Sequence, residues 1–251
     1  MDFINFLGTG GARYVVTRQI RKSGGIWVSL DGSNILIDPG PGSLSSLFSN
    51  KPKLSPLNLD GIILSHRHID HSNDINIMIE AMTNGGYKKR GEILAPKDAV
   101  YNDPVILKHF RNHITSINIL KEKGKYKIGN ITISTPVKNI HGVETYSFNI
   151  VGNNKSLSII SDTKYFEGLT DYFKSDILII YVVLKDRKKN VLHLSIKDVE
   201  KIVNENKPQL TILTHFGMNL IRSNPDRIAR SITKRTGCRV IAANDGQRFE
   251  I

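Results

Sequence analysis

The feature that most constrains the fold of this chain is a dense group of candidate metal ligands directly after an apolar run. The run at 61–64 predicts a buried strand. Shortly after it, the six residues 66–71 contain four candidate ligands: His66, His68, Asp70 and His71. Alternate residues of an extended chain point the same way, so His66 and His68 can share one ion. We expect Asp70 and His71, where the chain turns toward a predicted helix, to face a second ion. The fold must therefore bring further ligands to this point.

Size and cysteine content narrow the classes of site and fold. A chain of 251 residues is near the upper limit for one hydrophobic core, so we expect a single domain over 1–251. No apolar run is long enough for a membrane span, and the N-terminus lacks the features of a signal peptide, so a soluble, cytoplasmic protein is expected. Cys238 is the single cysteine. A disulfide within the chain and a thiolate zinc cluster are excluded, and any metal must be held by His, Asp or Glu.

Short apolar runs alternate with turn signals along the whole chain, which is typical of a sheet-rich α/β domain. Gly32-Ser33 and 152–154 are expected to be hairpin turns. Strands are predicted at 3–7, 26–30, 34–37, 61–64, 117–120, 131–135, 147–151, 157–160, 177–183, 210–213 and 239–242, and helices at 74–82, 196–206 and 225–234. Two β-rich stretches, each followed by helices, predict two sheets packed face to face with helices outside.

Single histidines and an aspartate follow later predicted strands. His141 comes after the strand at 131–135, Asp162 after 157–160 and His215 after 210–213. His193 precedes the helix at 196–206, where a helix-capping role is the alternative to a functional one. The remaining histidine pair, at 109 and 113, has no third ligand beside it and is interpreted as a surface feature.

Residues 66–71 resemble the H-x-H-x-D-H signature of the metallo-β-lactamase superfamily. Asp38 stands where that superfamily carries a strand-end aspartate that supports the metal ligands without binding the metal. His141, Asp162 and His215 stand where its later single ligands fall. The resemblance spans nearly the whole chain, and it implies a four-layer αβ/βα sandwich with two metal ions in a groove between the sheets.

The details resemble the ribonuclease Z-like branch of the superfamily. The opening Gly-Thr-Gly-Gly-Ala-Arg at 8–13 is similar to the start of those enzymes, and 161–163 and 214–216 resemble their G-D-T and T-H-[IF] elements. His193, followed by Ser195, resembles their H-S-T motif. The resemblance gives His193 a catalytic role on the leaving group or the transition-state phosphate, and not the role of a ligand.

The resemblance also implies a ligand set and a cofactor. One ion would be held by His66, His68 and His141, the other by Asp70, His71 and His215, with Asp162 bridging the two. Two divalent ions are expected, Zn²⁺ first, with Mn²⁺ and Fe²⁺ as alternatives. The implied chemistry is hydrolysis by a metal-bridging hydroxide. Asp70 would accept a proton from the attacking water and His193 would donate one to the leaving alkoxide.

The chain departs from ribonuclease Z at one place that bears on substrate. In that enzyme a long arm that grips tRNA lies between the ligands equivalent to His141 and Asp162, whereas here only twenty residues separate them. A short hairpin fills the interval, so specific tRNA processing is not expected. Leu194 and Ser161 also replace residues of the H-S-T and G-D-T elements, and neither change removes a ligand.

Charge and family together favour a phosphodiester substrate. Thirty-five Lys and Arg against 23 Asp and Glu give a net charge of +12, which suits RNA or single-stranded nucleic acid as a partner. The basic residues are nevertheless spread over short groups that are usually solvated faces. Two alternatives stay open: a hydrolase of a small cyclic phosphodiester, ester or lactone, and a non-catalytic nucleic-acid-binding protein. No membrane partner is expected, and a homodimer is left open.

Overall fold

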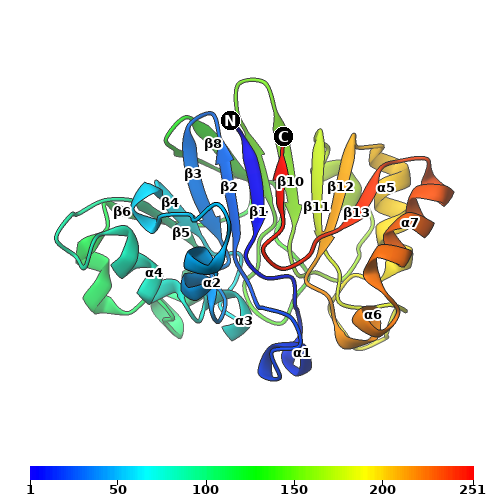
Figure 1. The fold of residues 1–251 in the computed structure, drawn as a ribbon, viewed down its shortest axis with the longest axis horizontal. Helices are drawn as coiled ribbons and strands as arrows, with labels where there is room; N and C mark the ends of the chain where they lie inside the picture. The colour runs from blue at the N-terminus through cyan, green and yellow to red at the C-terminus, as the bar shows by residue number, and fades with distance from the viewer.

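Two β-sheets face each other in the computed structural model, which describes residues 1–251, and helices lie on both outer sides (Figure 1). Each sheet has seven strands. Helices α2 and α4 flank the sheet on the left of Figure 1, and α5 and α7 flank the sheet on the right. This arrangement confirms the predicted αβ/βα sandwich. No helix is both long and apolar enough to cross a membrane.

The first sheet has the strand order β14-β1-β2-β3-β4-β5-β6. Its strands from β14 to β3 pair antiparallel, and those from β3 to β6 pair parallel. The bounds are β1 Phe3–Phe6, β2 Ile26–Leu30, β3 Ser33–Ile37, β4 Gly61–Ile63, β5 Glu92–Ala95, β6 Ser116–Ile119 and β14 Arg248–Glu250. The late strand β14 thus brings the end of the chain back beside β1.

The second sheet repeats this mixture of directions in the order β13-β12-β11-β10-β9-β8-β7. Strands β7 to β10 pair antiparallel, and β10 to β13 pair parallel. The bounds are β7 Gly124–Ile128, β8 Ile131–Thr135, β9 Phe148–Val151, β10 Ser156–Ile160, β11 Ile177–Tyr181, β12 Leu210–Thr214 and β13 Val240–Ala242.

Alternation along the strands divides the apolar side chains between three layers. In β3, Ile35 and Ile37 join the core between the sheets, whereas Leu36 packs under the helices of its own side. In β11, Ile179 lies between the sheets and Ile180 packs under α5 and α7. Strands such as β3 and β11 are covered on both faces and consist of nearly continuous apolar runs, as buried strands do.

The helices are short apart from two in the second half. Helix α5 starts with a capping box between Ser195 and Asp198 and buries Val199, Ile202 and Val203. The bounds are α1 Arg13–Thr17, α2 Ser43–Ser49, α3 Ile69–Ser72, α4 Ile75–Met82, α5 Ile196–Asn206, α6 Met218–Arg222 and α7 Pro225–Thr236, with short turns at η1 Pro56–Asn58, η2 Asp98–Asn102, η3 Lys108–His113 and η4 Leu169–Tyr172.

The structure corrects the first predicted turn and adds strands that the pattern did not indicate. The β2–β3 turn is Asp31-Gly32, one residue earlier than predicted, because both residues have positive φ, 49° and 76°. This is the Asp-Gly chemistry of a tight hairpin. Strands β5, β7 and β14 were not predicted. Two lysines of β7 point to solvent, so its sequence looked like a charged loop.

Strand ends position the candidate site. Asp38 directly follows β3, and His215 directly follows β12. Asp162 lies two residues beyond β10, and His66 lies three residues beyond β4. Because β3 is parallel to β4, and β10 and β12 are both parallel to β11, these ends meet at one edge of the sandwich. Ligand sites in α/β sheets commonly lie outside such carboxyl ends.

Candidate metal centre

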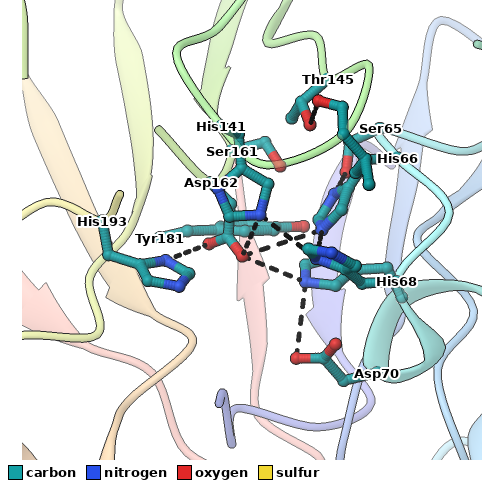
Figure 2. Close-up of polar contacts among 12 residues, drawn as sticks. Ser65, His66, His68, Asp70, His141, Thr145, Ser161, Asp162, Tyr181 and His193 are labelled. Carbon is teal, nitrogen blue, oxygen red and sulfur yellow. Dashed lines mark hydrogen bonds and ion pairs between the residues drawn. The ribbon is translucent and has the colours of Figure 1, made fainter. Parts of the chain in front are cut away.

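The first half of the chain contributes one continuous segment to the site. After β4 the chain bends at Ser65 and continues without regular structure to His68, and the one-turn helix α3 then carries Asp70 and His71. Gly40 permits this close packing, because a Cβ added there would overlap the carbonyl oxygen of Asp70. The candidate ligands of this segment therefore come from two short pieces of backbone, and Figure 2 shows three of them, His66, His68 and Asp70.

The second half contributes single residues from separate loops. His141, Asp162 and His193 approach the first segment from the side of the second sheet, as Figure 2 shows. His215 packs on the N-terminal glycine segment: Phe216 N donates to Thr9 O at 2.8 Å, and a Cβ at Gly11 would lie 2.5 Å from the His215 ring. The glycine-rich start of the chain thus makes room for a ligand more than 200 residues away.

Three imidazoles form the first group that could hold an ion. His68 Nδ1 lies 3.0 Å from His66 Nε2 and 3.2 Å from His141 Nε2. Donor atoms around a tetrahedral Zn²⁺ with bonds of about 2.0–2.1 Å are roughly 3.4 Å apart. The three nitrogens are therefore already close to the spacing that a shared ion requires.

Asp70, His71 and His215 form the second group. Asp70 Oδ2 is 3.6 Å from His71 Nε2 and 3.6 Å from His215 Nε2. Both of these nitrogens are buried without a hydrogen-bond partner. Buried polar atoms without partners are costly, and a bound cation would satisfy them.

The Asp162 carboxylate lies between the two groups. Its Oδ2 atom is 3.8 Å from His66 Nε2 and 4.0 Å from His141 Nε2 on one side. On the other side it is 3.5 Å from the Nε2 atoms of both His71 and His215. Asp162 is only 3% exposed. One buried oxygen thus faces both groups.

Protonation favours metal binding in the first group. Burial lowers the pKa of His66 well below its usual value, lowers that of His68 to about 4 and lowers that of His141. These imidazoles are therefore neutral at pH 7, as ligands must be. The second group has more carboxylate neighbours: burial would lower the pKa of His71, but Asp70 and Asp38 outweigh it and raise that pKa. Without metal His71 therefore tends to hold a proton, which a bound ion would displace. The whole cluster is able to bind metal ions.

Contacts behind the ligands orient three of the rings. His71 Nδ1 donates to Asp38 Oδ2 at 3.1 Å, and His141 Nδ1 donates to Leu192 O at 3.0 Å. Ser65 donates its hydroxyl hydrogen to Asp38, so its Oγ can accept from His66 Nδ1 at 3.0 Å. Each ring then presents Nε2 to the cluster. Such partners fix the tautomer of a metal-binding histidine.

Tyr181 is a site residue that the sequence did not indicate. It ends the aliphatic strand β11, and its hydroxyl donates to Asp38 Oδ2 at 3.1 Å. Its ring stacks against His71 and His215 at centroid distances of 5.8 and 5.1 Å. Burial, together with the Asp38 carboxylate, raises the pKa of Tyr181, so it stays a neutral donor. The available signal was a polar aromatic residue at the carboxyl end of an otherwise aliphatic strand.

His193 lies beside the cluster and outside its ligand groups. Its Nδ1 is 3.3 Å from Asp162 Oδ1, and its side chain is 19% exposed. It lines a pocket of about 250 Å³ together with Arg13, His68 and Asp70. Burial would lower the pKa of His193, but the Asp162 carboxylate outweighs it and raises that pKa. The helix-capping alternative is wrong, since Ser195 caps α5.

The histidine pair at 109 and 113 lies elsewhere, on η3. His113 Nδ1 is 3.4 Å from Glu80 Oε2, and neither histidine belongs to a group of three candidate ligands. The seven candidate ligands singled out from the sequence come together in the groups His66, His68 and His141; His66, His71 and Asp162; and Asp70, His71 and His215. His193 and Asp38 lie beside these groups, in contact with Asp162 and His71 respectively.

Two curated relatives match most of the chain. The uncharacterized protein MJ1374 of Methanocaldococcus jannaschii is 29% identical over 255 residues, covering 99% of this chain and 94% of that protein. The probable metallo-hydrolase YhfI of Bacillus subtilis is 27% identical over 209 residues, covering 78% of this chain and 82% of that protein.

Solved structures share the fold over the whole chain. The crystal structure of YhfI has a TM-score of 0.83 at 20% identity, covering 100% of this chain and 99% of that chain. A diphosphatase from the PhnP family has a TM-score of 0.71 at 17% identity, covering 100% and 98%. The short form of human tRNase Z has a TM-score of 0.72 at 16% identity, covering 99% of both chains. Residues 33–216 match the beta-lactamase superfamily domain. This match spans most of the chain and shows that the chain belongs to the beta-lactamase superfamily, with the fold of a metallo-β-lactamase protein.

Proposed function

We propose that this protein is a dinuclear metal-dependent hydrolase of phosphodiesters. The observation that carries the proposal is the position of Asp162, whose single buried oxygen lies between two groups of candidate ligands. A carboxylate in that position suits a bridge between two ions. The proposed ligands are His66, His68 and His141 for one ion, Asp70, His71 and His215 for the other, and Asp162 for both.

The two ions, when bound, would supply Lewis-acid activation of the attacking water and offset the charge on the phosphoryl oxygens. Zn²⁺ suits these nitrogen and oxygen donors, and Mn²⁺ and Fe²⁺ are the alternatives. The chain's own residues handle the protons. Asp70, at the wall of the groove, accepts a proton from the attacking water, whose oxygen bonds to phosphorus.

His193 donates a proton to the leaving oxygen as its bond to phosphorus breaks. Its Nδ1 faces Asp162 Oδ1, which leaves Nε2 as the nitrogen available to the substrate. The Asp162 carboxylate raises the pKa of His193 and so favours the protonated form that a general acid needs.

The phosphodiester class is supported by charge and by structural relatives. The chain carries a net charge of +12, and its structural neighbours include a diphosphatase and the short form of human tRNase Z. Strands β9 and β10 are joined by the short turn at 152–155, in the interval where ribonuclease Z carries its arm. We therefore propose weak, sequence-tolerant binding to single-stranded RNA or to strand ends, with poor discrimination for tRNA precursors.

The test is a substrate panel on protein reconstituted with Zn²⁺. The panel contains bis(p-nitrophenyl) phosphate, an unstructured oligoribonucleotide and a tRNA precursor with a 3′ trailer. Turnover of the phosphodiesters is expected, and Asp162→Ala should abolish it, which excludes a contaminating enzyme. No turnover of any phosphodiester by protein that binds its metal would contradict the proposal.

A hydrolase of small esters or lactones is the second candidate. The tight β9–β10 hairpin favours it, because the chain has no extended arm there to hold a large nucleic acid. Activity confined to a lactone or carboxylic ester panel would move this candidate into first place.

A further inference from the structure

A second pocket adjoins the candidate metal centre through His193. It has a volume of about 410 Å³ and is lined by Lys164, Arg187, Lys188, Lys189, His193 and Asp198, among others. His193 also lines the pocket of about 250 Å³ beside the candidate metal centre. The imidazole therefore forms the wall between the two pockets. We call the second one the basic pocket.

The basic pocket carries an excess of positive charge that the protein does not neutralise. Asp198 is 1% exposed, caps α5 and pairs with Arg187. Glu167, nearby in sequence, pairs with Lys201. The exposed lysines at 164, 188 and 189 are left without a carboxylate partner. Three ammonium groups around one concave surface favour an anionic ligand.

The loop that carries Lys188 and Lys189 is anchored at its base and in its middle. Leu184 N donates to Leu194 O at 3.1 Å, which closes the loop at its base. In its middle, Arg187 reaches the buried Asp198 at the start of α5. On the opposite wall, Lys164 N donates to Ile140 O at 2.9 Å, beside the candidate ligand His141. The backbone segments that carry the lysines are thus anchored near the metal centre.

The position of His193 indicates which side of a substrate would occupy the basic pocket. In the proposed function His193 gives its proton to the leaving oxygen, so the leaving group lies against the imidazole. The same imidazole lines the basic pocket, so this pocket adjoins the place of the leaving group. We propose that the basic pocket binds an additional phosphate carried by the leaving group, so that the preferred substrate is a phosphodiester with a further phosphate on its leaving side. This inference rests on the proposed function.

Three uridine dinucleotides test whether the additional phosphate is recognised on the leaving side of the substrate. One has no terminal phosphate, one has a 5′-phosphate and one has a 3′-phosphate, and the products identify which oxygen leaves. The phosphate on the leaving side should raise kcat/KM, and the phosphate on the other side should not. In Lys188→Ala/Lys189→Ala this preference should fall about tenfold or more, as expected when charge-assisted contacts to a phosphate are removed.

The matched control is Lys88→Ala/Lys89→Ala, which removes the same two charges from an exposed lysine pair outside the pocket. It should keep the full preference, and Lys164→Ala should lower it from the opposite wall. Equal losses in the two double variants would overturn the proposal. So would turnover of bis(p-nitrophenyl) phosphate together with equal or absent turnover of the three dinucleotides. No turnover of any phosphodiester would instead contradict the proposed function itself.

Discussion

The two halves of the sandwich contribute to the candidate metal centre in different ways. The first half supplies four side chains from one segment, 66–71, held by the end of β4 and the single turn of α3. The second half supplies His141, Asp162, His193 and His215 from four separate loops. One half thus presents a local motif, and the other presents an arrangement that exists only once its sheet has formed.

The two halves of the sandwich also contribute different parts of the proposed chemistry. In the proposed assignment each ion has two ligands from the first half and two from the second, namely one histidine, either His141 or His215, and the shared Asp162. The proposed bridge and the proposed proton donor both come from the second half. The first half alone would hold an incomplete site, so the packing of the two sheets decides whether the centre is complete.

Asp162→Asn should have the largest effect, because the bridge serves both ions. Metal content after Zn²⁺ reconstitution should fall at both positions. Turnover should fall by more than the 10²- to 10⁴-fold expected for loss of one proton donor. His109→Ala, at a histidine outside the site, is the control and should keep wild-type metal content. Normal metal content in Asp162→Asn would argue against a bridge.

His141→Ala and His215→Ala sharpen the role of the second half. Each variant should lose about one ion, and a different one, since these residues belong to separate groups. The double variant should then retain almost none, as measured by elemental analysis. If the double variant kept one ion per chain, the two histidines would share a position and the assignment of two groups would be wrong.

His193→Ala should leave metal content intact and reduce turnover of an unactivated phosphodiester about 10²- to 10⁴-fold. The loss should be smaller for bis(p-nitrophenyl) phosphate, because p-nitrophenolate leaves without much help from an acid. Steady-state rates on the two substrates provide the measurement. Equal losses would assign His193 to positioning the phosphate.

Tyr181→Phe should have the smallest effect of these variants. It removes one hydrogen bond to Asp38 while keeping the ring that stacks on His71 and His215. Loss of an orienting partner typically costs about 10- to 100-fold in metal affinity or activity. A chelator titration should show weaker binding of the ion held with His71 and His215. A larger loss at the other ion would contradict this path, because Asp38 contacts His71 directly and reaches His66 only through Ser65.

The sequence predicted the first half of the site better than the second. The segment 66–71 indicates a metal site by itself, because four candidate ligands in six residues are rarely a structural accident. The isolated residues His141, Asp162 and His215 were marked only by their positions after predicted strands, and their assignment as ligands came from family resemblance. Fold class followed from the alternation of apolar runs and turns.

What the sequence could not supply were contacts between distant segments. Tyr181 looked like one more strand residue until the sheet placed it against Asp38. Strand β5 has only four residues and no alternation, so its burial depends on its neighbours. The basic pocket combines Lys164 with the loop at 187–189. Because these residues are far apart in the sequence, no sequence motif indicates the pocket.

Metal stoichiometry tests the central claim most directly. The account holds that the two halves together build one centre for two ions. Elemental analysis of folded wild-type protein after Zn²⁺ reconstitution and removal of loose metal should give about two ions per chain. A value near one would leave Asp162 without a bridge to form, and a value near zero would contradict the metal centre itself.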